Sequence, residues 1–177
     1  LVKEQVDDKM LSRLIRYAIE RKRTESLERE RVKLETEIAE RKLAEKALAE
    51  QAIHDALTNL YNRGYFNHRI QQELAQADRS KYILAILLCD LDLFKIINDT
   101  RGYQVGDEVL KAVARSIRES TRGTDLVFRW GGDEFVIVLT DATRDGVLVA
   151  AERVRKGVRT VSEQAKVALD LSIGVAL

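Results

Sequence analysis

The first 63 residues contain no glycine, and the whole sequence contains no proline, although proline averages about 5% of residues in proteins. Both residue types disfavour a helix interior, so their absence permits one long uninterrupted helix. From Glu20 to Lys46 nearly every second residue is charged, the two signs almost balance, and good helix formers dominate. We therefore expect residues 1–50 to form a helical stalk, about 75 Å long if it is continuous.

Apolar residues recur along this stalk at the spacing of a coiled coil. Leu27, Leu34 and Leu48 share one heptad position, and Ile38 and Ala52 share its partner position, although charged residues interrupt the seam. A helix this polar buries little by itself. A two-stranded coiled coil, and hence a homodimer, is therefore favoured over a single solvated helix that lies against the next domain.

Composition narrows the class of protein. The net charge of +1 argues neither for nor against nucleic acid, no apolar run approaches the length of a membrane helix, and no secretory signal opens the chain. The single cysteine, Cys89, excludes an intrachain disulfide and is expected to be an inert core residue. We expect a cytoplasmic protein with no membrane segment and no nucleic-acid polymer as partner, and, because the first residue is Leu, a piece of a longer protein.

The pattern changes after the stalk, and residues 51–177 are predicted to form a separate domain. Residues 82–94 form a near-continuous apolar run, typical of a strand buried on both faces. Helical spacing follows in residues 106–120 and 143–161, and strands are indicated at 125–130 and 134–140 around a glycine turn. Residues 166–177 are predicted to form a last strand, in which apolar residues alternate from Val167. The order β-α-β-β-α-β predicts an α+β, ferredoxin-like fold.

This topology brings acidic residues together. The β-α-β crossover makes strands 82–94 and 125–130 parallel, with room for a strand between them. If strand 134–140 fills that slot, Asp90 and Asp92 lie beside Asp133 and Glu134. Carboxylates this close resist ionising together, and a divalent cation removes the conflict. Oxygen-only ligands favour Mg²⁺ or Mn²⁺, and acids on adjacent strands suit metal-assisted phosphoryl transfer. Asp92 is expected to be structural rather than catalytic.

Four motifs resemble one known family. The letters GGDEF at 131–135, followed by an apolar strand, resemble the motif after which the GGDEF domain of diguanylate cyclases is named. HDALTNLYNRGYF at 54–66, DLDLFKIINDTRGYQVGDEVL at 90–110 and LSIGVAL at 171–177 resemble the family's other motifs in order and spacing. The amphipathic start of the stalk more weakly resembles the last helix of a receiver domain. The resemblance implies a nucleotidyl-cyclase palm preceded by a coiled-coil helix. It also implies a homodimer that condenses two GTP into cyclic di-GMP and two pyrophosphates with Mg²⁺ or Mn²⁺.

The resemblance also implies roles for residues. The metal would be held by the Asp90 carboxylate, the Leu91 carbonyl, Asp133 and Glu134. Asp133 and Glu134 would be the catalytic pair, with Asp133 accepting the 3′-hydroxyl proton. Asp55 and Asn62 read as a brace at a helix end rather than as site residues.

Substrate contacts follow from the same resemblance. Asn98 and Asp107 would read guanine, whose N–H donors suit a carboxylate. Lys95 would touch phosphate, and Gly131 and Gly132 would let the backbone approach the triphosphate. Two alternatives stay open: Asp107 could be a cap or first-turn acid of helix 106–120, and Asn98 a turn residue.

The tetrapeptide RGTD, Arg122 to Asp125, resembles the family's inhibitory site for its product; the alternative is a surface turn with a local ion pair. The family continues past the last strand into a helix with phosphate-binding Lys and Arg, so we expect the domain to lack its C-terminal end here. Three rival functions remain: an idle module that binds cyclic di-GMP or GTP and dimerises, a cyclase for another nucleotide, and a structural dimerisation rod.

Overall fold

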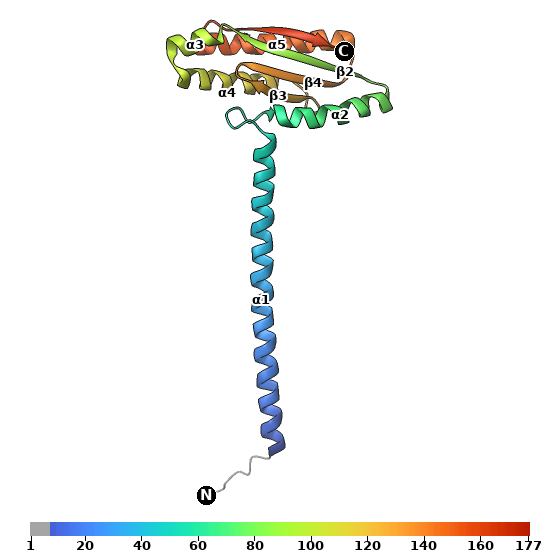
Figure 1. Ribbon diagram of the computed structural model, residues 1–177, viewed down its shortest axis with the longest axis vertical. Coiled ribbons are helices and arrows are strands. Elements are labelled where there is room, and N and C mark those ends of the chain that lie inside the picture. The colour runs from blue at the N-terminus through green and yellow to red at the C-terminus, as the bar shows by residue number, and fades with distance from the viewer. Residues whose placement is uncertain (1–7) are drawn as a thin grey trace. The chain divides into compact units, whose positions relative to one another are not determined.

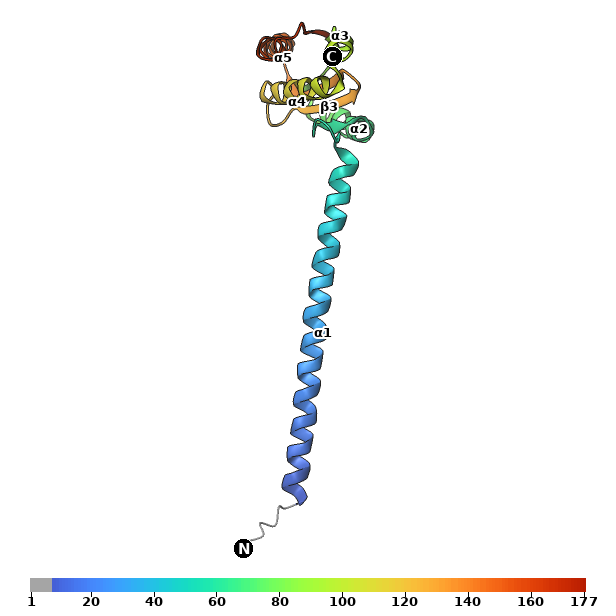
Figure 2. The same cartoon turned by 90° about the vertical axis from the view of Figure 1, so that its left-hand side faces the viewer.

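Helix α1 (Asp8–Ile53) is the longest element of the computed structural model, which describes the backbone of residues 8–177 and the side chains of residues 10–43 and 52–177. The chain divides into two units, residues 1–49 and 50–177. Figures 1 and 2 show α1 as one continuous helix, as its sequence predicts. The first seven residues of the predicted stalk and the Leu48 side chain lie outside the described residues.

The surface of α1 is polar and carries spaced apolar residues. Ion pairs one turn apart join Arg21 to Glu25 and Arg31 to Glu35, each at 2.9 Å. The seam residues Leu27, Leu34 and Ile38 are 58%, 58% and 47% exposed in the single chain. The helix itself is therefore confirmed, whereas its pairing with a second copy stays a prediction.

Unit 50–177 is built on a five-stranded sheet with the order β1-β3-β4-β2-β5. Its strands are β1 (Tyr61–Asn62), β2 (Ile83–Asp92), β3 (Leu126–Gly131), β4 (Glu134–Ala142) and β5 (Asp170–Ala176). Strand β4 lies between β3 and β2 and is antiparallel to both, so the slot predicted for the hairpin partner is the one it fills. The two-residue β1, parallel to β3 at the sheet edge, was not anticipated.

Four helices accompany the sheet: α2 (Arg63–Ser80), α3 (Phe94–Arg101), α4 (Tyr103–Glu119) and α5 (Arg144–Ala165). Helix α4 starts three residues earlier than predicted, because Gly102 at φ 84° ends α3 and also serves as the N-cap of α4. Helix α5 follows Thr143, whose side chain accepts a hydrogen bond from the Gly146 N–H and caps the helix.

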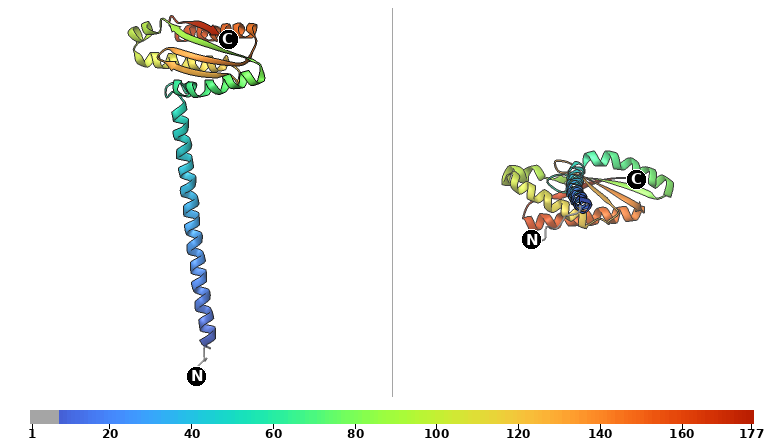
Figure 3. Two further views of the ribbon diagram at one scale, coloured as in Figure 1. Left: turned by 45° about the vertical axis from the view of Figure 1, so that its right-hand side comes forward. Right: turned by 90° about the horizontal axis from the view of Figure 1, so that it is seen from below.

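The helices cover the two faces of the sheet unequally, as Figures 1 and 3 show. Helices α3, α4 and α5 pack on one face, where the larger core includes Leu87, Val113, Phe135, Ile137 and Val154. Helix α2 packs on the other face over a smaller core that includes Phe128 and Val136. Both faces of the sheet are therefore covered by helices, and the predicted site lies at the strand ends. In residues 8–177, no helix has the combined length and apolar character that crossing a bilayer requires.

Candidate active site

The glycine pair forms the turn between β3 and β4. Gly131 pairs with Glu134 across the hairpin, which leaves Gly132 and Asp133 as the loop. Gly132 has φ 50°, a left-handed backbone conformation that residues with a Cβ adopt only at a steric cost. A Cβ on either glycine would meet no atom within 4 Å, so the hairpin needs glycine at position 132 for its backbone conformation and not for space.

The end of β2 meets this hairpin, as predicted from the topology. Asp90 lies directly opposite Glu134 in the ladder, so their side chains share one face of the sheet. The Leu91 N–H donates to the Asp133 carbonyl at 3.3 Å. Because the N–H and C=O of one residue in an antiparallel strand point toward the same neighbour, the Leu91 carbonyl also faces the hairpin.

The electrostatics of Asp90 reflect this crowding. Loss of contact with water raises the pKa of the Asp90 carboxyl, and the charges of Asp133 and Asp92 raise it further. Among the described residues, however, no three His, Cys, Asp or Glu side chains are gathered closely enough to hold a metal ion. The structure thus brings the predicted positions together without gathering three carboxylates at one point. The donors fit a divalent cation by type, because all are oxygens and a cation would relieve the repulsion at Asp90.

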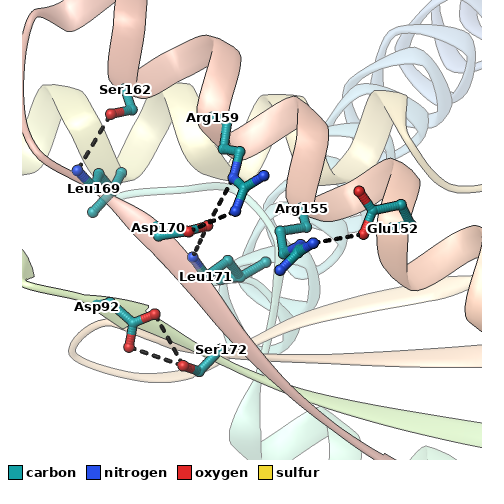
Figure 4. A network of polar contacts seen from close by, with 9 residues as sticks. All are labelled: Asp92, Glu152, Arg155, Arg159, Ser162, Leu169, Asp170, Leu171 and Ser172. Carbon is teal, nitrogen blue, oxygen red and sulfur yellow. Dashed lines mark hydrogen bonds and ion pairs between the residues drawn. The ribbon is translucent and has the colours of Figure 1, made fainter.

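Asp92 points to a different partner. Both of its carboxylate oxygens lie 2.9 Å from the Ser172 hydroxyl on β5, which confirms the structural interpretation of this acid. Figure 4 shows this contact beside the Asp170–Arg159 ion pair, which joins the start of β5 to α5 at 2.9 Å. The Arg159 guanidinium and the Leu171 N–H together lower the pKa of Asp170. These contacts hold the edge strand against β2 and α5.

Arg129 connects the hairpin to the opening motif, a role that the sequence analysis missed. Its Nε and Nη2 donate to the Gly132 carbonyl at 3.1 and 2.8 Å, and its Nη1 donates to the Asp55 carboxylate at 3.0 Å. Burial by itself would raise the pKa of Asp55, but hydrogen bonds from Thr58 and Arg129 outweigh burial and lower it. The carbonyl preceding Asp133 is therefore fixed by a side chain whose other end is anchored 74 residues away.

The opening motif forms the brace expected at a helix end. The Asn62 side chain caps α2 by accepting from the Tyr65 N–H at 2.9 Å, and it donates to the Ala52 carbonyl at 2.9 Å. His54 stacks on Tyr61 with ring centroids 4.9 Å apart, so this histidine is part of the same packing. Asp55 and Asn62 are thus structural, as predicted.

The two predicted guanine-reading residues lie on consecutive helices that pack together. Asn98 is inside α3, so the alternative that it is a turn residue is wrong. Asp107 lies in the second turn of α4, whose N-cap is Gly102 and whose first turn holds no acid, so the capping alternative is also wrong. Lys95 is exposed in the first turn of α3. Asn98 and Asp107 are therefore not needed to end or to cap a helix.

In the turn from Arg122 to Asp125, the side chain of Asp125 is buried. Asp125 is 3% exposed, and its Oδ2 accepts from the Arg122 N–H at 2.7 Å, so the contact is a backbone hydrogen bond rather than the ion pair of the alternative interpretation. Both residues line a cavity of about 200 Å³ together with Arg153 of α5, which the sequence analysis missed. Only the fold shows that Arg153, 31 positions after Arg122, faces the same cavity.

Cys89 is fully buried, and burial raises the pKa of its thiol to about 12, which confirms an inert thiol.

Comparison with known proteins decides the family. The diguanylate cyclase GGDEF domain matches residues 52–177. This chain belongs to that family. Among curated proteins, this chain is 43% identical over 127 residues to the diguanylate cyclase DosC of Escherichia coli (strain K12). That match covers 70% of this chain and 28% of DosC, so the chain spans less than a third of this curated relative.

Two solved structures have the same fold. One is the coiled coil and GGDEF domain of DgcB from Caulobacter crescentus in complex with c-di-GMP. It is 25% identical with a TM-score of 0.75, over 85% of this chain and 82% of that one. The other is SiaD from Pseudomonas aeruginosa in complex with its activator SiaC. It is 32% identical with a TM-score of 0.67, over 95% of this chain and 65% of that one.

Proposed function

We propose that this chain is a diguanylate cyclase that condenses two GTP molecules into cyclic di-GMP and releases two pyrophosphates. The observation that carries the proposal is the register of β2 against β4, which sets Asp90 opposite Glu134 and beside Asp133 in a domain of the GGDEF family. DosC, the curated relative compared above, is named a diguanylate cyclase. The single buried thiol is consistent with a reducing, cytoplasmic setting.

Each residue near the hairpin has a proposed part. The Asp90 carboxylate, the Leu91 carbonyl, Asp133 and Glu134 would hold Mg²⁺ or Mn²⁺, which when bound supplies positive charge against the phosphates. Asp133 accepts the proton of the attacking 3′-hydroxyl, aided by Glu134. Lys95 balances phosphate charge as a point cation. The tight backbone of Gly131 and Gly132 lets the triphosphate lie close to the chain.

The base would be recognised on α3 and α4. Asp107 accepts the N–H donors of the guanine Watson–Crick edge, and the Asn98 amide pairs with the adjacent acceptor. Adenine offers the carboxylate no N1–H, so the pair favours GTP over ATP. The chemistry then depends on positioning, because each domain holds one GTP and the ring closes only when two domains face each other.

We further propose the organisation that this requires: residues 1–50 as a stalk that dimerises as a coiled coil, and residues 51–177 as the GGDEF domain. Pairing of the stalk raises the effective concentration of the two half-sites. The exposed seam of α1 supports this part of the proposal, since Leu27, Leu34 and Ile38 have no covering partner within the described part of the single chain.

Product formation tests the function. Purified protein incubated with GTP and Mg²⁺ is expected to yield cyclic di-GMP on ion-exchange chromatography, and Asp133→Asn is expected to reduce the rate by at least about 100-fold. Asp78→Asn, which removes an exposed acid of α2, serves as the matched control and should keep the full rate. GTP left unconverted by the unsubstituted protein, or turned over equally by Asp133→Asn, would contradict the proposal.

A second candidate function is binding of cyclic di-GMP at the cavity of Arg122, Asp125 and Arg153. The guanidinium forks suit phosphate and guanine edges, and the cavity places two of them beside a buried carboxylate. We propose that the product binds there and restrains catalysis. Calorimetry should show cyclic di-GMP binding that Arg153→Ala weakens without loss of GTP turnover; equal binding by both proteins would contradict this assignment.

A further inference from the structure

Gly106 of α4 lies against the side chain of Asn98 in α3. A Cβ atom on Gly106 would collide with the Asn98 Oδ1, and would lie 3.1 Å from the Asn98 Cγ and 3.3 Å from the Phe94 Cζ. Packed interiors leave no slack for such an overlap. Any residue larger than glycine at position 106 would therefore displace the Asn98 amide.

The helix itself gives no reason for a glycine here. Gly106 has an ordinary helical backbone, unlike Gly102 and Gly132, whose φ angles are positive. Glycine in a helix interior is less favourable than alanine, because it gives up more backbone freedom on folding. The space beside Asn98 is thus the feature of the fold that requires glycine at position 106.

The Asn98 amide lies against Gly106 and is available to a ligand. It is half-buried, and its side chain makes no hydrogen bond to any described part of the chain, although its backbone carbonyl accepts from the Gly102 N–H at 2.9 Å. An amide in this state keeps two donors and one acceptor for a ligand. Asp107 follows Gly106 directly, so the two polar groups of the proposed guanine site are set by one short segment of α4.

We propose that Gly106 is a positioning residue: it sets the place of the Asn98 amide and so determines the preference for guanine over adenine. The inference rests on the proposed function, in which Asn98 and Asp107 read the base. Gly106 touches no substrate atom; it acts through the amide that packs on it.

A double-mutant cycle with nucleotide binding as the readout tests this. In calorimetry with Mg²⁺, Gly106→Ala is expected to weaken GTP binding about 10-fold, as Asn98→Ala does, and to shrink the preference for GTP over ATP by the same factor. In the double variant Asn98→Ala/Gly106→Ala the second substitution should add less than about 2-fold, because the amide it would displace is gone. Additive losses would overturn the inference.

A matched control separates positioning from general strain. A Cβ on Gly157 of α5 would lie 2.5 Å from the Ser116 Oγ and 2.9 Å from the Ser120 Oγ, a clash at the opposite end of α4. Gly157→Ala is therefore expected to lower the melting temperature while the GTP-to-ATP preference stays unchanged. If Gly106→Ala behaves in the same way, Gly106 is a packing residue only and the inference is wrong.

Thermal unfolding tests the contact between Gly106 and Asn98 without relying on nucleotide binding, so it can fail or succeed separately from the proposed function. Gly106→Ala should lower the melting temperature more in the Asn98 protein than in the Asn98→Ala protein, with or without nucleotide. If Gly106→Ala fails to fold, recovery of folding in the double variant identifies Asn98 as the obstacle, and failure of both refutes it. A protein that binds neither nucleotide but shows the thermal coupling would refute the guanine site and leave the steric contact standing.

Discussion

Arg129 shows how one side chain can link two distant parts of a GGDEF domain. Its guanidinium binds the carbonyl of Gly132 in the hairpin and the carboxylate of Asp55 in the opening motif. Both side chains of this ion pair are mostly buried, at 14% and 25% exposed, so the pair is shielded from salt more than a surface pair would be. The position of Asp133 therefore depends on a contact outside the hairpin.

Replacement of Asp55 tests this link through its pH dependence. Asp55→Asn is expected to lower the free energy of unfolding by about 1 kcal/mol at pH 7, because the amide can still accept from Thr58 but no longer carries charge opposite Arg129. The folded pKa of Asp55 is lowered. Its stabilising contribution is therefore complete above the unfolded pKa of about 4 and is lost as the pH falls through the folded pKa.

Urea unfolding at pH 7 and pH 3 measures this prediction. The difference between the unsubstituted protein and Asp55→Asn should shrink at pH 3. Asp78→Asn, which removes an exposed partner of Lys81, should show little difference at either pH. If Asp55→Asn lowers the free energy of unfolding by as much at pH 3 as at pH 7, the contact does not depend on the charge of Asp55.

The left-handed backbone of Gly132 predicts how substitutions at this position change stability. Gly132→Ala is expected to cost about 1 kcal/mol of unfolding free energy, because alanine adopts φ near +50° at a steric cost. Gly132→Asn should cost less, since asparagine tolerates this region better. Denaturant unfolding of the two variants gives the comparison, and an equal or reversed order would contradict the conformational explanation.

Among the elements, α2 depends on its cap. Asn62→Ala removes both the acceptor for the Tyr65 N–H and the donor to the Ala52 carbonyl, so it should lower the unfolding free energy by about 1–2 kcal/mol. Asn67→Ala on the exposed face of the same helix is the control, expected to be neutral or slightly stabilising. Circular dichroism during thermal unfolding compares them, and an equal effect of both would exclude capping.

The elements α1, β2, α4, α5 and the β3–β4 hairpin were predicted from sequence, whereas the 18-residue helix α2, the short elements α3 and β1, and the long-range contacts were not. The apolar run that became β2 and the β3–β4 hairpin carry their own periodicity, and their register follows from chain topology. The two residues of β1 are too few to show a period, and the break between α3 and α4 depends on the conformation of Gly102. Arg129 and Arg153 acquire partners only when distant segments meet, which no local pattern reports.

For the molecule as a whole, we predict that the stalk dimerises through the apolar seam of α1. Leu34→Lys on the proposed seam of α1 is expected to raise the dimer dissociation constant at least about 10-fold, because it places a charge in a coiled-coil core. Thr36→Lys adds the same charge to the opposite side of the helix and should leave dimerisation unchanged. Sedimentation equilibrium distinguishes them; a monomeric unsubstituted protein, or equal effects of the two variants, would contradict a paired stalk.

We propose that the end of β2 and the hairpin mouth form one cation site for a nucleoside triphosphate. Electron paramagnetic resonance of Mn²⁺ measures this directly. In the presence of GTP, the unsubstituted protein should bind Mn²⁺, and Asp90→Asn and Asp133→Asn should each weaken that binding at least about 10-fold, while Asp78→Asn binds as before. If either acid can be replaced without loss of Mn²⁺ binding, the two strands do not share an ion.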